Sequence, residues 1–305
     1  MAVKFFLPIR TRAQDANGSA GNFPKHGLSR QGQNGCKALL IHGLTGTPNE
    51  MGFLVHAFHQ KGYSILCPRL ANHGESLTVL QQTRWQECYQ SVRDAFLKLE
   101  AEPGDGPIFA SGLSMGALLA LLLADEFGDR VSGVSCLSPT LFYDGWNMPW
   151  SRHLLPIADY TPLKHLFYFK EEPPYGIKNE AIRQRIHRYY RGASIHDLEG
   201  VAQYGYPYFP VSLLCELRRL VRYLKKRLSH IRVPVQLIQA RDDDMTSVKN
   251  AQFLYRGIGS SDKELVLLDN SYHIITADYE RETVAQKMHE FFTRLRAGRE
   301  MPVSV

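Results

Sequence analysis

The stretch that decides the fold covers residues 108–124, with the sequence IFASGLSMGALLALLLA. Its first residues have the apolar character of a buried strand, and its last eight have that of a buried helix. A G-x-S-x-G motif, residues 112–116, stands between them. A serine on a tight strand-to-helix turn has an exposed hydroxyl, and small residues two positions before and after it avoid clashes with the neighbouring strand and helix. The pattern therefore predicts that Ser114 is a nucleophile.

Strands and helices alternate on both sides of this turn. Apolar runs predict strands at 37–42, 63–70, 107–110, 131–137, 233–240 and 264–268. Helical spacing of apolar residues predicts helices at 49–61, 83–100, 115–127, 248–258 and 281–296. Repeated β-α alternation predicts an α/β fold with a mostly parallel, doubly wound sheet.

One segment breaks the alternation. Residues 142–229 are rich in Tyr, Pro and Arg, and we interpret them as an inserted, mainly helical lid. The core then consists of 1–141 and 230–305, in which 1–36 form a polar, partly irregular N-terminal segment with at most a short strand. The net charge of +6 comes largely from residues 151–230, which hold 14 Lys and Arg against 7 Asp and Glu.

The bulk composition is that of a globular protein with a sizeable core, since 44% of the 305 residues are hydrophobic and 22% are charged. The five cysteines are scattered without a CxxC pair, so we expect buried free thiols rather than disulfides or a zinc site. No signal-peptide pattern and no membrane-spanning stretch is apparent, and a cytoplasmic location is the expectation.

A second motif, residues 42–46 (HGLTG), directly follows the strand at 37–42. Acyl transfer creates an oxyanion that needs two backbone N–H donors. We expect these from Leu44 and from Met115, the residue after the nucleophile. His42 could reach the site or brace the loop by a hydrogen bond.

An acid and a base complete the constellation. His273 follows the strand at 264–268 and is the candidate to take the proton of Ser114 and donate it to the leaving group. Asp242, Asp243 and Asp244 follow the strand at 233–240, and one of them would orient the histidine. All these groups fall at carboxyl ends of expected strands, where open α/β sheets bind ligands.

Five phrases resemble the α/β-hydrolase superfamily, and more narrowly the bacterial carboxylesterases and monoacylglycerol lipases. They are LLIHGLTGTPNEM (39–51), KGYSILCPRLANHGES (61–76), GLSMG (112–116), VQLIQARDDDM (235–245) and SYHIITAD (271–278). The resemblance covers roughly residues 37–140 and 230–295 and reaches the lid by position only. It implies that Asp243 is the acid of the triad. One departure is Tyr272, where many members have glycine.

The resemblance implies a serine hydrolase that cleaves carboxylic esters, either short or medium acyl esters or monoacylglycerol, through an acyl-enzyme on Ser114. The same triad serves amidases, peptidases, thioesterases and carbon–carbon hydrolases, and a non-catalytic ligand-binding member is a further alternative. Haloalkane dehalogenases and epoxide hydrolases carry an aspartate where this sequence has the serine of the G-x-S-x-G motif, so Ser114 argues against both activities. Neither a metal nor an organic cofactor is implied.

The expected partner is a small-molecule ester, contacted by Gly43, Thr45, Phe142 and Tyr143. Further lid aromatics could line an acyl pocket or pack the lid itself: Trp146, Trp150, Phe167, Tyr168, Tyr204, Tyr206 and Tyr208. No nucleic-acid-binding motif is present. The basic lid suggests a weak contact with an anionic lipid surface, and the sequence leaves the oligomeric state open.

Overall fold

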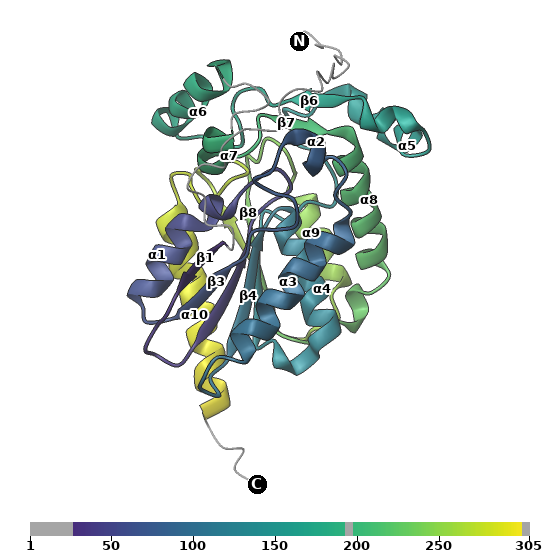
Figure 1. Ribbon diagram of the computed structural model, residues 1–305. Helices are drawn as coiled ribbons and strands as arrows, with labels where there is room; N and C mark the ends of the chain where they lie inside the picture. The colour runs from purple at the N-terminus through teal and green to yellow at the C-terminus, as the bar shows by residue number, and fades with distance from the viewer. Residues whose placement is uncertain (1–26, 193–197, 301–305) are drawn as a thin grey trace.

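A seven-stranded sheet forms the centre of the protein in the computed structural model, which describes residues 27–192 and 198–300 (Figure 1). The strands are β1 (Leu28–Arg30), β2 (Lys37–Ile41), β3 (Ser64–Cys67), β4 (Ile108–Leu113), β5 (Gly133–Leu137), β8 (Val235–Ala240) and β9 (Lys263–Leu268). Their order is β1-β3-β2-β4-β5-β8-β9, and every neighbouring pair is parallel except β1 with β3. The carboxyl ends of the six parallel strands therefore meet at one edge.

Helices cover both faces of the sheet. The helices α1 (Gly52–Gln60) and α10 (Arg281–Glu300) pack with one hydrophobic cluster, and α3 (Trp85–Glu100), α4 (Met115–Phe127), α8 (Val211–Lys225) and α9 (Lys249–Gly257) with the other. Short helices are η1 (Pro48–Met51), α2 (Leu77–Leu80), η2 (Gly128–Arg130) and η5 (Leu228–His230). Buried apolar area on two faces of one sheet is the main source of stability in such a layered fold.

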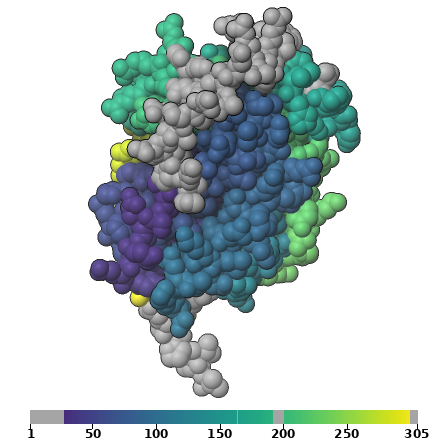
Figure 2. Space-filling view, in the orientation of Figure 1, coloured from purple at the N-terminus to yellow at the C-terminus, as the bar shows by residue number. Residues whose placement is uncertain are grey.

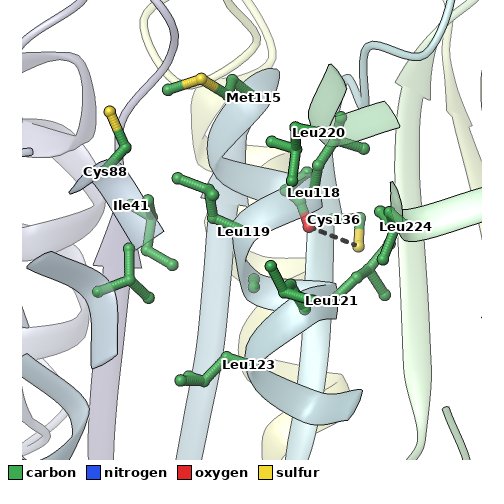
Figure 3. Close-up of a cluster of buried hydrophobic side chains, with 14 of the residues drawn as sticks. Ile41, Cys88, Met115, Leu118, Leu119, Leu121, Leu123, Cys136, Leu220 and Leu224 are labelled. Atoms are coloured by element: carbon green, nitrogen blue, oxygen red, sulfur yellow. Dashed lines mark hydrogen bonds between the residues drawn. The ribbon is translucent and has the colours of Figure 1, made fainter. Parts of the chain in front are cut away.

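The helix α4 is buried on nearly all sides, which its uninterrupted apolar sequence requires. Figure 3 shows its Leu118 and Leu121 directed toward Leu220 and Leu224 of α8. Cys136 in β5 donates a weak hydrogen bond from Sγ to the Ala117 carbonyl, at 3.9 Å. This packing holds the start of α4, and with it Ser114, in a fixed place above the sheet.

The described part of the segment predicted as the lid lies largely over the edge where the parallel strands end (Figure 1) and at the top of the space-filling view (Figure 2), and we keep the name lid for it. It contains η3 (Trp150–Leu154), α5 (Leu155–Ala158), η4 (Pro162–His165), α6 (Glu180–Gly192) and α7 (Leu198–Tyr204), and an antiparallel pair, β6 (Tyr168–Lys170) with β7 (Tyr208–Pro210). The segment predicted as the lid also includes α8, which contacts α3 and α4 of the core. The division of the chain at residue 229 stays a prediction.

The predicted fold class is confirmed: the chain has an α/β fold with a mostly parallel sheet flanked by helices. The strand expected at 63–70 is shorter than predicted, and the helix expected at 49–61 begins as the 3₁₀ turn η1 because Pro48 opens it. Most of the N-terminal segment, residues 1–26, lies outside the described residues. All five cysteines, each within the described ranges, are buried and outside disulfide bonds, as expected. Within the described ranges, the helices are too short or too polar to cross a membrane.

Candidate active site

Ser114 lies on the turn between β4 and α4 with φ 57° and ψ −113°, a backbone conformation that residues other than glycine rarely adopt. Its N–H donates to the Leu137 carbonyl at 2.8 Å, which fixes the turn to the end of β5. A Cβ at Gly112 would lie 2.1 Å from the Gly116 carbonyl carbon, and one at Gly116 would lie 2.3 Å from the Ile41 carbonyl oxygen. Both positions of the motif therefore need glycine for steric reasons.

Asp243 and His273 meet at the ends of β8 and β9. Asp243 Oδ2 lies 2.9 Å from His273 Nδ1, and both side chains are buried. The same carboxylate accepts hydrogen bonds from the backbone N–H groups of Met245 and Thr246, each at 2.8 Å, and from Gln239 Nε2 at 2.7 Å. These donors fix its orientation, so it can hold the imidazole with Nδ1 protonated and Nε2 directed elsewhere.

The other two aspartates occupy different positions. Asp242 is exposed, and its Oδ2 lies 3.7 Å from Lys178 Nζ. Asp244 accepts hydrogen bonds from the backbone N–H groups of His273, at 3.4 Å, and Gly176, at 3.2 Å. Burial and the charge of Asp243 raise the pKa of Asp244 to about 6. Asp244 thus links the lid to the histidine loop, while the imidazole contacts Asp243.

The His273 imidazole is tuned by its surroundings. Burial lowers its pKa, but the charge and hydrogen bond of Asp243 outweigh this, and the carboxyls of Asp244 and Glu50 act in the same direction. The net result is a pKa above the ordinary value of 6.5. The site therefore favours the imidazolium that a general base becomes during catalysis.

Ser114 Oγ forms its hydrogen bond with Thr140 Oγ1, at 2.8 Å. Thr140 is buried just beyond the end of β5, and no sequence motif marks it. Its position after the strand next to β4 is the one signal that could have indicated it. Ser114 and His273 line the same pocket.

The loop of residues 42–45, which we call the oxyanion loop, lies beside Ser114. In the described part of the chain, the N–H groups of Leu44 and Met115 have no protein acceptor. The Met115 N–H belongs to the first turn of α4, where unpaired N–H groups favour negative charge. His42 is fully buried, where burial and the nearby His73 ring lower its pKa well below 6.5. It accepts from the Leu70 N–H and donates from Nδ1 to the Gly43 carbonyl, so its contacts brace the loop.

A pocket opens above these groups between the core and the lid. The core contributes Gly43, Leu44, Thr45, Glu50, Leu113, Ser114, Met245, His273 and Ile274 to its walls. The lid contributes Tyr143, Glu171, Tyr175, Ile186, Tyr190, Tyr204, Gly205, Tyr206 and Phe209. Among the expected substrate contacts, the structure brings Gly43, Thr45 and Tyr143 to this pocket.

Phe142 does not join the pocket walls. Its ring lies 5.7 Å from that of Phe253, and Lys225 Nζ lies 4.2 Å above it. Neighbouring residues on an irregular segment point in different directions, and only the Tyr143 side chain of this pair faces the pocket.

Two carboxyls in the pocket were not singled out from the sequence. Burial raises the pKa of Glu50 to about 7, against the opposite effects of the Gly43 N–H and His273. Burial and the charge of Asp244 raise the pKa of Glu171 to about 8. Glu171 comes from a segment without a recognisable motif, and Glu50 stands near the end of the phrase 39–51 without a pattern that assigns it a role. Only the folded chain brings both carboxyls to His273.

Comparison with known proteins agrees with this geometry. The family described as "Serine aminopeptidase, S33" matches residues 36–280, a range that includes Ser114, Asp243 and His273, the residues predicted as the triad. The chain belongs to this family of α/β hydrolases. The family resemblance inferred from the sequence is thereby confirmed.

Two curated relatives cover most of the chain. A thermostable monoacylglycerol lipase from Bacillus sp. (strain H-257) is 28% identical over 258 residues, 84% of this chain and 90% of that protein. A carboxylesterase from Bacillus subtilis (strain 168) is 27% identical over 259 residues, 84% of this chain and 92% of that protein. They place the chain among the lipase- and esterase-type hydrolases, the class that cleaves carboxylic esters.

Solved structures show the same relationship. One from the metagenome-derived lipolytic enzymes LipS and LipT has a TM-score of 0.72 and 26% identity, covering 89% of this chain and 99% of that chain. A soluble variant of the monoglyceride lipase from Saccharomyces cerevisiae has a TM-score of 0.69 at 18% identity, covering 88% of this chain and 89% of that chain, and shows the fold alone.

Proposed function

We propose that this α/β hydrolase cleaves small carboxylic esters through a covalent acyl-enzyme on Ser114. The observation that supports this most strongly is the convergence of three strand ends. It places a serine on a strained turn in one pocket with a histidine whose Nδ1 is held by a buried carboxylate. This is the arrangement that nucleophilic acyl transfer needs.

In this mechanism Ser114 Oγ attacks the ester carbonyl carbon while His273 Nε2 takes the hydroxyl proton. The oxyanion formed accepts hydrogen bonds from the N–H groups of Leu44 and Met115. Collapse of the tetrahedral intermediate breaks the bond to the alcohol, which leaves with the proton from His273. Water then attacks the acyl carbon while His273 takes its proton, and the second tetrahedral intermediate collapses with cleavage of the bond to Ser114 Oγ. Oγ regains the proton from His273, and the carboxylic acid leaves.

The substrate that fits the pocket has an apolar acyl chain and a small polar alcohol. Ile186, Phe209 and Met245 supply apolar wall, while the carboxyl of Glu171 offers an acceptor for a hydroxyl group. Monoacylglycerols and short or medium acyl esters combine these properties. The names of the relatives, a monoacylglycerol lipase and a carboxylesterase, point to the same class.

The test compares matched ester, thioester and amide substrates that carry the same acyl group, with Ser114→Ala as the control. We expect the ester to have the highest kcat/KM and activity to be highest on short or medium p-nitrophenyl esters and monoacylglycerols. A higher kcat/KM for the amide or the thioester would contradict an ester hydrolase and support the corresponding alternative activity.

We further propose that the outer end of the lid contacts an anionic lipid surface. Residues 150–166 expose several large apolar side chains, among them Ile157 at 65% and Tyr160 at 84% exposure. The bases Arg152 and Lys164 lie in the same segment, and Lys164 Nζ lies 3.8 Å from Asp159 Oδ1. Its one acid is Asp159, which is buried and paired with Arg219 and Arg222. Apolar side chains among cationic ones suit the interface of an anionic membrane.

Sedimentation with vesicles tests this contact. The protein should bind vesicles that contain phosphatidylserine, less at high salt, and Ile157→Asp should weaken binding without changing hydrolysis of a soluble ester. Equal binding of the variant and the parent would contradict the proposed surface.

A further inference from the structure

Three side chains hold the peptide groups of Gly43 and Leu44 in the oxyanion loop next to Ser114. His42 Nδ1 donates to the Gly43 carbonyl at 3.0 Å, and the His73 ring contacts the Leu44 carbonyl through Nε2 at 2.8 Å. The Gly43 N–H donates to Glu50 Oε2 at 2.9 Å. With Gly43 N–H occupied by Glu50, the Leu44 N–H is the group of this pair that stays available for a substrate oxygen.

Glu50 is packed directly against the loop that it holds. A Cβ at Gly46 would lie 2.0 Å from its carboxyl carbon, so the carboxyl fills the space that a side chain there would need. A Cβ at Gly43 would lie 3.3 Å from Glu50 Oε2 and 3.6 Å from Ser114 Cβ. The Glu50 carboxyl thus lies one glycine away from the nucleophile and lines the same pocket as His273.

We propose that Glu50 is a positioning residue of the active site, which fixes the oxyanion loop through the Gly43 N–H so that the Leu44 N–H faces the reacting carbonyl oxygen. This inference rests on the proposed acyl-transfer function. The physical reason is that a donor stabilises the oxyanion only where its position is set before the reaction begins. Glu50 lies in the 3₁₀ turn η1, which follows the oxyanion loop, and from there its carboxyl accepts the Gly43 N–H.

The charge of Glu50 has a second effect that can be measured separately. Its carboxyl faces His273, Glu171 on the lid, Tyr190 on α6 and Cys67 at the end of β3. Toward His273 its negative charge acts with Asp243 and Asp244 to raise the imidazole pKa. Replacing the carboxyl by a neutral group should therefore lower the pH at which His273 loses its proton.

Two substitutions separate the hydrogen bond from the charge. Glu50→Gln keeps an oxygen acceptor at the same reach and removes the charge. Glu50→Asp keeps the charge but withdraws the acceptor by one methylene. The matched control is Glu216→Asp, since Glu216 also accepts a backbone N–H, from Trp85 at 3.2 Å, outside the pocket. All rates are divided by the concentration of enzyme that a fluorophosphonate titrates, so that unfolded protein does not count.

We expect Glu50→Asp to lower kcat roughly tenfold or more with little change in KM, because the oxyanion forms only during the reaction. Its acid limb of kcat/KM should stay close to that of the parent. Glu50→Gln should keep kcat within about threefold on the alkaline plateau, because its amide oxygen still accepts the Gly43 N–H. Its acid limb should move to lower pH, and Glu216→Asp should match the parent in both.

A Glu50→Asp enzyme with the kcat of the parent would overturn the proposal. So would a Glu50→Gln enzyme with the same loss as Glu50→Asp, or an acid limb that does not move in Glu50→Gln. Ser114→Ala, measured alongside, separates this from the proposed function. An active Ser114→Ala enzyme refutes acyl transfer itself, whereas an inactive one with unaffected Glu50 variants refutes only the role of Glu50.

Discussion

The strand-end edge of the core and the lid above it form one pocket, but they are built in opposite ways. At the core edge each catalytic group is fixed by short-range hydrogen bonds: four donors reach Asp243, and Ser114 is tied to the end of β5. The lid contributes tyrosines and apolar side chains from segments between residues 143 and 209. From this difference we infer that the proposed chemistry depends on the rigid edge and that the choice of substrate depends on the lid.

The largest effect short of removing the nucleophile is expected from Asp243→Asn, an exchange that keeps the shape and removes the charge. The amide can stabilise neither the imidazolium nor the tautomer with a proton on Nδ1, and kcat should fall by about 10⁴-fold. Steady-state kinetics on a p-nitrophenyl ester measure this. Asp242→Asn is the matched control, because its exposed carboxylate pairs with Lys178 outside the triad, and its kcat should match the parent. An equal loss of kcat in both variants would contradict the assignment of Asp243 as the acid that orients His273.

The rigidity of the core edge can be broken at Gly116. A Cβ there would lie 2.3 Å from the Ile41 carbonyl oxygen and 2.7 Å from that of His42, so Gly116→Ala would push α4 away from β2 and the oxyanion loop. We expect the free energy of unfolding to fall by roughly 1–3 kcal/mol or more, with a loss of kcat. Denaturant unfolding measures it. Gly52→Ala is the control, since nothing lies within 4 Å of the added Cβ and helix α1 should be unharmed; a similar loss there would remove the steric explanation.

The lid can be tested at two adjacent residues. Tyr143 lines the pocket, whereas Phe142 packs against Phe253 and Lys225. Tyr143→Ala should raise KM for a medium-chain ester by roughly tenfold and alter the acyl-chain profile. The reason is that the substrate loses the apolar contact with one aromatic side chain. Phe142→Ala should leave KM within about twofold. If the two variants changed KM equally, the pocket walls described above would be wrong.

The smallest effect expected is a shift in pH dependence. Because the pKa of His273 is raised, kcat/KM should fall with decreasing pH through an apparent pKa above 6.5. Activity requires the neutral imidazole, so it is present above that pKa and lost below it. Asp244→Asn removes one of the charges that favour the imidazolium and should move this limb to lower pH. A limb that stayed in place would mean that Asp244 acts on the loop but not on the histidine.

The difference between the two regions also explains what the sequence could predict. Ser114, the oxyanion loop and His273 follow predicted strands, and a parallel sheet brings strand ends to one edge. Local patterns therefore sufficed to predict that these residues meet in one place, while their roles stay predictions. Asp243 needed a family resemblance because three aspartates stand in a row. Glu50, Thr140 and Glu171 were missed because nothing local to them indicates what they face. Their places depend on how η1, the end of β5 and the lid pack around the pocket, and the same dependence separated Tyr143 from Phe142.

The central claim, that Ser114 carries the acyl group, is tested most directly by fluorophosphonate labelling followed by mass mapping of the adduct. The account predicts a single adduct on Ser114, complete loss of ester hydrolysis in step with labelling, and a kcat lower by about 10⁶-fold in Ser114→Ala. An adduct on another residue, or a Ser114→Ala enzyme that hydrolyses esters at the rate of the parent, would contradict it.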